Sequence, residues 1–262
     1  MESNMIATLG SDPEFFIKDK EGKLKSIIGL LGGTKEAPKM IDDFGAFRVQ
    51  EDNVAAEYNI PPSESKERFI QHILWPQKVI AKIIGTDKYE ISTLASASFP
   101  NEELLDPKAL EFGCDPDFNA WKDGKENTKP KCKDKNFRTA GGHVHIGMED
   151  KSPLNIVRTI RNMDKFVGVW SVITDPDNKR RQLYGKSGSF RPQPHGCEYR
   201  TLSNFWIFDE GLIGEVWDRT QMAVANTELL DPKSDEGKLI QHIINKGDKA
   251  TAFAYLREQG ML

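Results

Sequence analysis

The chain has 262 residues, a net charge of −4 and a hydrophobic content of 38%. This composition is typical of a soluble globular protein and excludes a fibrous or largely disordered one. The mildly acidic balance gives no reason to expect a nucleic-acid surface, and no apolar run is long enough to span a membrane. The N-terminus lacks a signal-peptide pattern, and Cys114, Cys132 and Cys197 lie far apart. We therefore expect free thiols and a cytoplasmic protein.

The first half of the chain predicts strands followed by one helix. Residues 5–18 predict a strand, the charged turn at 19–23 predicts a hairpin, and residues 46–50 and 54–60 predict two more strands. Ser63 is a candidate helix cap, because apolar residues recur after it at near-helical spacing. Pro76 should kink or split this helix, and Gly85 should end it.

The second half predicts a different mixture. Residues 89–99 and 140–148 are typical of strands, and 101–112 are partly helical. A helix is expected from Ser152 to about Thr174, then a glycine-rich turn, a strand over 197–202, and helices near 212–229 and 235–258. Trp75, Trp170, Trp206 and Trp217 are expected in the core. Strands and helices do not alternate regularly, so we predict a single α+β domain over residues 1–262.

Residues 119–138 form a Lys-rich stretch that is poor in apolar residues. This composition predicts a mobile surface loop. Such a loop could act as a lid over an anionic substrate, or it could be a solvated segment without such a role.

Strongly polar residues recur at two-residue spacing in four predicted strands. They are Asp12 and Glu14; Asn53, Glu57 and Asn59; His143 and His145; and Glu198 and Arg200. Residues two apart on a strand share a face, and any one pair alone fits a solvated face. Together, however, they would make a poor core, and clustered carboxylates repel one another unless a cation is present. Oxygen ligands with an occasional imidazole favour Mg²⁺ or Mn²⁺ over zinc.

Cationic residues cluster around the sequence YGKSGSFR. They are Arg180, Arg181, Lys186 and Arg191. The glycines and serines of this stretch allow backbone amides to approach a phosphate, although the order is not that of a Walker A loop. Beside a carboxylate cluster, these cations favour a polyphosphate ligand.

Five motifs carry a family resemblance: GSDPEFF, DNVAAEYN, FGCDPDFNAW, GGHVHIG and the run from YGKSGSFR to GCEYRTL. Over residues 9–205 the chain resembles the phage-type COOH–NH2 ligases (amidoligase type 2) of the glutamine synthetase and glutamate–cysteine ligase superfold. The resemblance implies a funnel formed by a curved antiparallel sheet, with helices on its outer face. It also implies an ATP- and Mg²⁺-dependent ligase that forms an amide through an acyl phosphate. The substrates would be a carboxylate and an amine, as small molecules or peptides.

The resemblance also assigns roles to residues. The implied metal ligands are Asp12, Glu14, Glu57, His143 and Glu198; the implied nucleotide-binding residues are Arg191, Lys186, Arg181, Asn53 and His145; the implied catalytic residues are Arg191, Arg200 and His145. Cys114, Asp115 and Asp117 lie in a family motif, so the resemblance makes them candidates for shaping the substrate site, and packing is an equal candidate for Cys114. Glutamine synthetases carry E-x-E where this chain has Asp12-x-Glu14, and they are much longer, so their amino-acid and ammonia sites do not carry over.

Several alternatives remain at this stage. The His143/His145 pair and the acids could instead serve a metal-dependent hydrolase that needs no nucleotide. A degenerate ligase that only binds a nucleotide or a partner is a third reading, which the complete set of acids disfavours. Both a homo-oligomer and a chain that acts alone fit the resemblance, and a phage origin would place the protein in the host bacterial cytoplasm.

Overall fold

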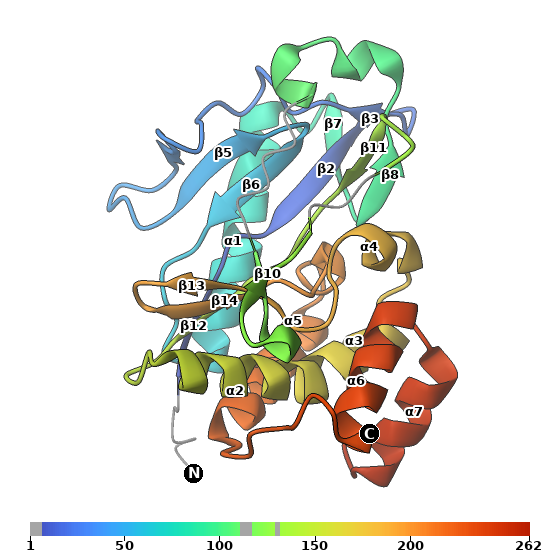
Figure 1. Cartoon of the computed structure of the whole chain (residues 1–262). Helices are drawn as coiled ribbons and strands as arrows, with labels where there is room; N and C mark the ends of the chain where they lie inside the picture. Colours follow the sequence, from blue (N-terminus) through green and yellow to red (C-terminus); the bar gives the residue numbers. More distant parts are fainter. Residues whose placement is uncertain (1–6, 111–116, 129–131) are drawn as a thin grey trace.

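The structure is a computed structural model that describes residues 7–110, 117–128 and 132–262 (Figure 1). The strands are β1 (Thr8–Ser11), β2 (Glu14–Asp19), β3 (Leu24–Lys25), β4 (Lys39–Met40), β5 (Arg48–Asp52), β6 (Ala55–Asn59), β7 (Tyr89–Ser92), β8 (Ser96–Ser98), β9 (Phe118–Asn119), β10 (Lys125–Glu126), β11 (Phe137–Thr139), β12 (Val144–Gly147), β13 (Ser189–Gln193) and β14 (Gly196–Tyr199). The α-helices are α1 (Lys66–Ile84), α2 (Pro153–Met163), α3 (Val169–Thr174), α4 (Asn178–Leu183), α5 (Glu210–Ala225), α6 (Asp235–Lys246) and α7 (Lys249–Glu258). Short 3₁₀ turns include η2 (Pro107–Leu110) and η3 (Ala120–Lys122).

The strands form antiparallel sheets that meet at one corner. One sheet has the order β1-β12-β14-β13-β9-β10, and another has the order β3-β2-β6-β5-β4 with β7 also paired to β2. The chain passes from the first sheet to the second at Asp12-Pro13, between β1 and β2. Tyr58 N donates to Pro13 O (3.1 Å) and Ile60 N donates to Ser11 O (3.2 Å), so the chain of β6 continues along both strands. The expected curved antiparallel sheet is therefore confirmed.

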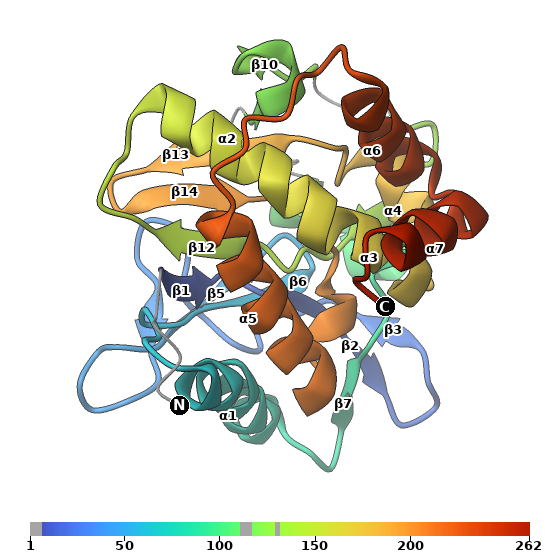
Figure 2. The same cartoon turned by 90° about the horizontal axis from the view of Figure 1, so that it is seen from below.

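The helices pack on one face of this sheet. Seen from below, α1, α2 and α5 lie in front of the strands (Figure 2), and α2 contacts both β13 and β14. Val144 and Ile146 of β12, with Cys197 and Tyr199 of β14, are fully buried in the core that the helices share with the sheet. Because strand residues alternate between faces, His145 of β12 projects from the opposite face. No helix in the described residues is long and apolar enough to cross a membrane.

The structure corrects two predictions in the first half. The strand expected over residues 5–18 is interrupted at Asp12-Pro13, because proline cannot continue a ladder by donating a hydrogen bond. The first helix is capped by Ser65 and stays helical through Pro76, rather than beginning at Ser63 or splitting. Ser63 instead pairs with Leu9 of β1. Gly85, with φ 93°, ends the helix as predicted.

The second half agrees more closely with the prediction. Ser152 caps α2, and helical structure continues to Thr174 through one π turn at Asp164–Gly168. The helix expected over 235–258 is divided into α6 and α7, because Gly247 adopts the left-handed conformation (φ 64°) and Asp248 caps α7.

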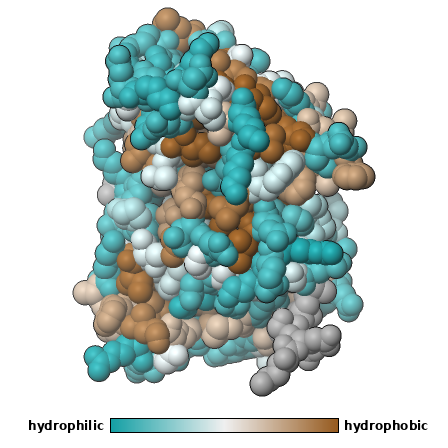
Figure 3. All heavy atoms as spheres, turned by 180° about the vertical axis from the view of Figure 1, so that it is seen from behind, coloured by the Kyte–Doolittle hydropathy of each residue, from teal (hydrophilic) through white to brown (hydrophobic). Residues whose placement is uncertain are grey.

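The four tryptophans predicted in the core do not all lie there. Trp170, Trp206 and Trp217 are buried, but Trp75 of α1 is 39% exposed and its ring lies 4.8 Å from that of Phe47. The face of the molecule opposite to that in Figure 1 is largely hydrophilic and carries apolar patches (Figure 3).

The Lys-rich stretch over 119–138 contains local structure. β9, η3 and β10 form a short hairpin-like unit, and β11 at its end pairs with β8. The buried Arg161 of α2 donates from Nε (3.0 Å) and Nη2 (2.8 Å) to Ala120 O, which attaches the start of this stretch to the helix layer. Its mobility remains a prediction.

Candidate functional site

A single cross-strand row carries the first group of polar side chains. In register, Gly10 of β1 faces His145 of β12, which faces Glu198 of β14, which faces Arg191 of β13. Side chains opposite one another on antiparallel strands project from the same face. His145, Glu198 and Arg191 therefore meet on the face turned away from the helices, as the two-residue spacing predicted.

Asp12 joins this row from the corner between the sheets. Its Oδ1 lies 3.3 Å from His145 Nε2 and 3.2 Å from His143 Nδ1. Both Asp12 Oδ1 and His145 Nε2 are buried, and among the described residues neither has a hydrogen-bond partner. Asp12, His145 and Glu198 each offer a ligand atom, and these atoms lie within 4.8 Å of one another. We call these three residues the histidine-containing cluster.

Two arginines and one glutamine donate hydrogen bonds to the fully buried Glu198. Arg200 Nη1 donates to its Oε1, while Arg191 Nη1 (3.4 Å) and Gln193 Nε2 (2.9 Å) donate to its Oε2. Burial would raise the pKa of Asp12, but the charges of His145 and His143 hold it well below its usual value. Burial alone would lower the pKa of His145, but the negative charge of Asp12 outweighs this effect, so the pKa of His145 is raised.

His143 differs from His145 in its surroundings. It precedes β12, its Nδ1 lies 3.5 Å from Arg200 Nη1, and burial together with that guanidinium lowers its pKa. A neighbouring guanidinium opposes a second cation at the same nitrogen. His143 Nδ1 also lies 3.3 Å from Glu198 Oε1, so both imidazoles contact the carboxylates of this cluster, and the choice of metal ligand between them stays a prediction.

A second group of carboxylates lies on the adjoining sheet. Glu14 of β2 faces Glu57 of β6, which faces Gln50 of β5, and Gln50 Nε2 donates to Glu57 Oε2 (2.8 Å). Carboxylate oxygens of Glu14, Asp52 and Glu57 lie within 4.8 Å of one another. We call these three residues the acidic cluster.

Burial and mutual repulsion act on the carboxylates of the acidic cluster. Gly141 N donates to Glu14 Oε2 (2.8 Å), but burial and the charge of Asp52 raise the pKa of Glu14 to about 8. Burial and the charges of Asp12 and Glu14 raise the pKa of Glu57 well above its usual value. Carboxylates in this situation either hold protons or share a cation.

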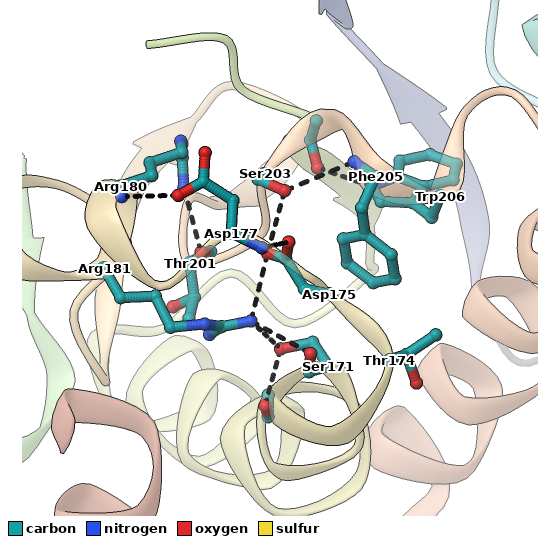
Figure 4. A network of polar contacts seen from close by, with 12 residues as sticks. Ser171, Thr174, Asp175, Asp177, Arg180, Arg181, Thr201, Ser203, Phe205 and Trp206 are labelled. Carbon is teal, nitrogen blue, oxygen red and sulfur yellow. Dashed lines mark hydrogen bonds and ion pairs between the residues drawn. The ribbon is translucent and has the colours of Figure 1, made fainter. Parts of the chain in front are cut away.

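Arg181 does not lie with these clusters. Its side chain is buried, and Nη2 donates to Asp175 Oδ2 (3.2 Å) and to the carbonyl oxygen of Ser171 (3.0 Å). Figure 4 shows this network, in which Ser203 also donates to Asp175. Arg181 thus forms a buried ion pair with Asp175, and its role in nucleotide binding stays a prediction.

Asn53 and Lys186 are also placed differently from the prediction. Asn53 lies in the turn between β5 and β6, and its Oδ1 accepts from Arg138 Nε (2.9 Å) rather than facing Glu57. Lys186 is half-buried beside Lys246. Burial lowers the pKa of its ammonium group, and the positive charge of Lys246 lowers it further. In the described part of the chain, no ion pair joins the ammonium group of Lys186 to either cluster.

The glycine-rich turn after α4 serves packing rather than an open phosphate cradle. Ser187 N donates to Asn245 Oδ1 (3.0 Å) and Ser189 N donates to Lys186 O (3.2 Å). A Cβ at Gly185 would lie 2.6 Å from Arg180 Nη1, and that glycine has φ 71°. The turn therefore leaves room for the buried guanidinium of Arg180.

Sequence reasoning missed Asp52 and gave no separate role to Arg180. Asp52 opens the motif DNVAAEYN, but the parity count began at Asn53. Arg180 is 3% exposed, its Nη1 donates to Thr201 O (3.2 Å), and burial lowers its pKa to about 10 although Glu14 opposes this effect. Asp117 is one of the acids whose charge raises the pKa of Arg200 against burial. Cys114 and Asp115 lie outside the described residues.

Comparisons with known proteins give one family and several solved structures that resemble the chain. Residues 133–259, slightly less than half of the chain, match the family described as Phage phiEco32-like COOH.NH2 ligase-type 2. This match confirms the resemblance over a range that includes His143, His145, Arg191, Glu198 and Arg200. No curated protein sequence gives a significant match.

Among solved structures, a bifunctional glutathione synthetase from Pasteurella multocida matches with a TM-score of 0.51 and 12% identity, over 97% of this chain and 46% of that one. The chain thus spans about half of that protein, and the likeness shows a shared fold. A Plasmodium falciparum glutamine synthetase (TM-score 0.39, 10% identity, 87% of this chain and 54% of that one) and a novel glutamine synthase homolog (0.35, 10%, 97% and 66%) also match.

Proposed function

We propose that the protein is an ATP-dependent carboxylate–amine ligase that uses Mg²⁺, or Mn²⁺ in its place. The observation that carries this proposal is the pair of adjoining clusters, Asp12–His145–Glu198 and Glu14–Asp52–Glu57, each with three ligand atoms within 4.8 Å of one another. The match of residues 133–259 to a ligase-type family supports the reaction class.

The residues present fit hard divalent cations. Five of the six groups are carboxylates, and oxygen ligands are those that Mg²⁺ and Mn²⁺ prefer. The buried atoms Asp12 Oδ1 and His145 Nε2 have no hydrogen-bond partner among the described residues, so both are suitable ligand atoms for such an ion. The acidic cluster would hold another ion, because burial and the neighbouring acids raise the pKa of Glu14 and of Glu57.

Bound Mg²⁺ would neutralise charge on the ATP phosphates and orient the reacting oxygens. Arg191 and Arg200 are placed on the same face as the clusters, and their guanidinium groups would stabilise the developing negative charge. The substrate carboxylate oxygen attacks the γ-phosphorus of ATP, which forms an acyl phosphate and releases ADP. An amine then attacks the acyl carbon, loses a proton, and expels inorganic phosphate to leave an amide.

The substrates we propose are a carboxylate and an amine carried by small molecules or peptides. The helix-free face of the curved sheet is the place for them, since it carries the arginines and both clusters. Arg200 faces Glu198, Asp12, Glu14 and Asp117, whose charges together raise its pKa against the effect of burial. A cation so surrounded is suited to a mobile anionic group that arrives together with metal ions.

Calorimetric titration with ATP, with and without Mg²⁺, tests the proposal. We expect Mg²⁺-dependent ATP binding in the wild type, its loss in Glu198→Ala, and its retention in Glu228→Ala. Glu228 is a control for the loss of one carboxylate, because it is exposed and its ion pair with Lys165 lies outside both clusters, and thermal unfolding verifies that Glu198→Ala is folded. Absence of ATP binding together with hydrolysis of an amide or ester in metal alone would contradict the ligase and favour the hydrolase.

A further inference from the structure

The turn between β5 and β6 has an unusual backbone for its sequence. β5 ends at Asp52 and β6 begins at Ala55, so Asn53 and Val54 make the whole connection. Asn53 has φ 56°, in the left-handed region that few residues other than glycine adopt. A conformation of this kind persists only where the surroundings hold it in place.

The Asn53 side chain accepts two hydrogen bonds, one from within the turn and one from outside it. Its Oδ1 accepts from the following amide, Val54 N (2.9 Å), and from Arg138 Nε (2.9 Å). The carbonyl of Val54 in turn accepts from Ile27 N (3.2 Å). The turn is therefore fixed by contacts with two segments that are remote in sequence.

Arg138 is the centre of these contacts. The residue is only 5% exposed, and it donates to the carbonyl oxygens of Ala109 (2.6 Å), Lys135 (2.8 Å) and Phe137 (2.9 Å). Its strand, β11, pairs with β8. One guanidinium thus connects the β5–β6 turn with η2 and with the segment that leads into β11.

Asp52 directly precedes this turn. It is the last residue of β5, it pairs with Ala55 across the turn, and its carboxylate belongs to the acidic cluster. Glu14 is the first residue of β2 and Glu57 lies within β6, whereas Asp52 is followed directly by the turn. The conformation of Asn53 therefore acts directly on the strand end that carries the Asp52 carboxylate.

We propose that Asn53 and Arg138 are positioning residues, which set Asp52 so that the acidic cluster can bind a divalent cation. This inference rests on the proposed function, because it assigns a cation to that cluster. Partners that orient metal ligands commonly change metal affinity by about 10–100-fold when they are removed. The pair also connects the cation site to the segment containing Lys135 and Phe137, which closes the Lys-rich stretch.

The chain offers a matched control for a purely structural role. Asp123 is the other non-glycine residue with positive φ (53°) in the described residues, and it also pairs with a buried arginine, Arg161 (3.3 Å). It lies in the η3–β10 connection, outside both clusters. Asn53→Gly and Asp123→Gly thus make comparable changes, because glycine tolerates the left-handed conformation and removes the acceptor.

The test is calorimetric titration of the full chain with Mn²⁺, combined with thermal unfolding to verify folding. We expect Asn53→Gly to weaken binding at the acidic cluster about 10–100-fold while binding at the histidine-containing cluster is unchanged. Asn53→Asp, which keeps an acceptor for Arg138 and Val54, should bind within a few-fold of wild type. Asp123→Gly should bind both ions as wild type does.

Two results would overturn this inference while leaving the ligase proposal in place. One is a folded Asn53→Gly that binds both ions as wild type does, and the other is an equal loss at both clusters. If the wild type binds no Mn²⁺, the proposed function and the inference fail together. Glu57→Gln and Glu198→Gln, titrated in parallel, assign each binding event to its cluster.

Discussion

The two clusters contain similar acids but differ in what surrounds them. In the histidine-containing cluster, Arg200, Arg191 and Gln193 donate to Glu198, and two imidazoles hold the pKa of Asp12 well below its usual value. In the acidic cluster, burial and neighbouring acids raise the pKa of Glu14 to about 8 and that of Glu57 well above normal. Arginines thus donate to a carboxylate of one cluster, whereas burial and neighbouring acids dominate the pKa values of Glu14 and Glu57 in the other.

This difference separates structural from functional demands on a carboxylate. Glu198 accepts hydrogen bonds from Arg200, Arg191 and Gln193 in a network that would be incomplete without it, so this carboxylate is part of the folded structure. Glu57 is ionised only against repulsion, so its charge becomes favourable when an external cation arrives. The same substitution, loss of one acid, should therefore have opposite effects on the stability of the cation-free protein.

The largest expected effect is that of Glu198→Ala on stability. Removal of this carboxylate leaves Arg200 and Arg191 close together without their shared partner, and breaking a buried pair commonly costs about 3–5 kcal/mol. Urea unfolding of the cation-free protein should show this loss, and Glu198→Gln should lose less because the amide oxygen still accepts. An Ala variant as stable as wild type would show that the arginines do not depend on Glu198.

Arg181→Ala removes a buried arginine that lies outside both clusters, and so separates a loss of stability from a loss of ATP binding. Asp175 would lose its buried partner, so we expect a destabilisation of up to about 3 kcal/mol. Because Arg181 faces Ser171 and Asp175, we expect the folded variant, in contrast to the sequence-based assignment, to bind Mg²⁺-ATP with wild-type affinity in calorimetry. A specific loss of ATP affinity in a folded variant would return Arg181 to the nucleotide site.

Glu57→Gln should have a smaller effect of the opposite sign. The raised pKa of Glu57 means that folding is penalised as the pH rises and the buried acid loses its proton. Glutamine removes this penalty, so the cation-free variant should be more stable by on the order of 1 kcal/mol, with a larger gain at pH 9 than at pH 6. Thermal unfolding at both pH values measures this effect. A gain that persists unchanged in saturating Mg²⁺ would contradict a cation at this cluster.

The sequence predicted those site residues that lie within regular strands. His145, Glu198 and Arg191 were found because period-two spacing places residues on one face, and the cross-strand register then aligns them. Asp12 and Glu14 were expected on one strand face, but the Pro13 break sends them to different clusters. Tertiary placement of this kind is not encoded in spacing alone.

The missed residues lie where periodicity ends. Asp52 stands before a two-residue turn, and counting even intervals from Asn53 selected the amide instead of the acid. Arg180 and Arg181 are adjacent on α4, so the helix directs them to different surroundings: Thr201 for one and Asp175 for the other. A cluster of cations in the sequence could not separate a structural arginine from one near the acids.

Counting the Mn²⁺ ions bound per chain by equilibrium dialysis tests the central claim most directly. Wild type should bind an ion at each cluster, whereas Glu57→Gln and Glu198→Gln should each lose one and keep the other. Glu228→Ala should retain both. Absence of Mn²⁺ binding in the wild type, or equal binding in all four proteins, would contradict the assignment of these clusters as the metal centres of a ligase.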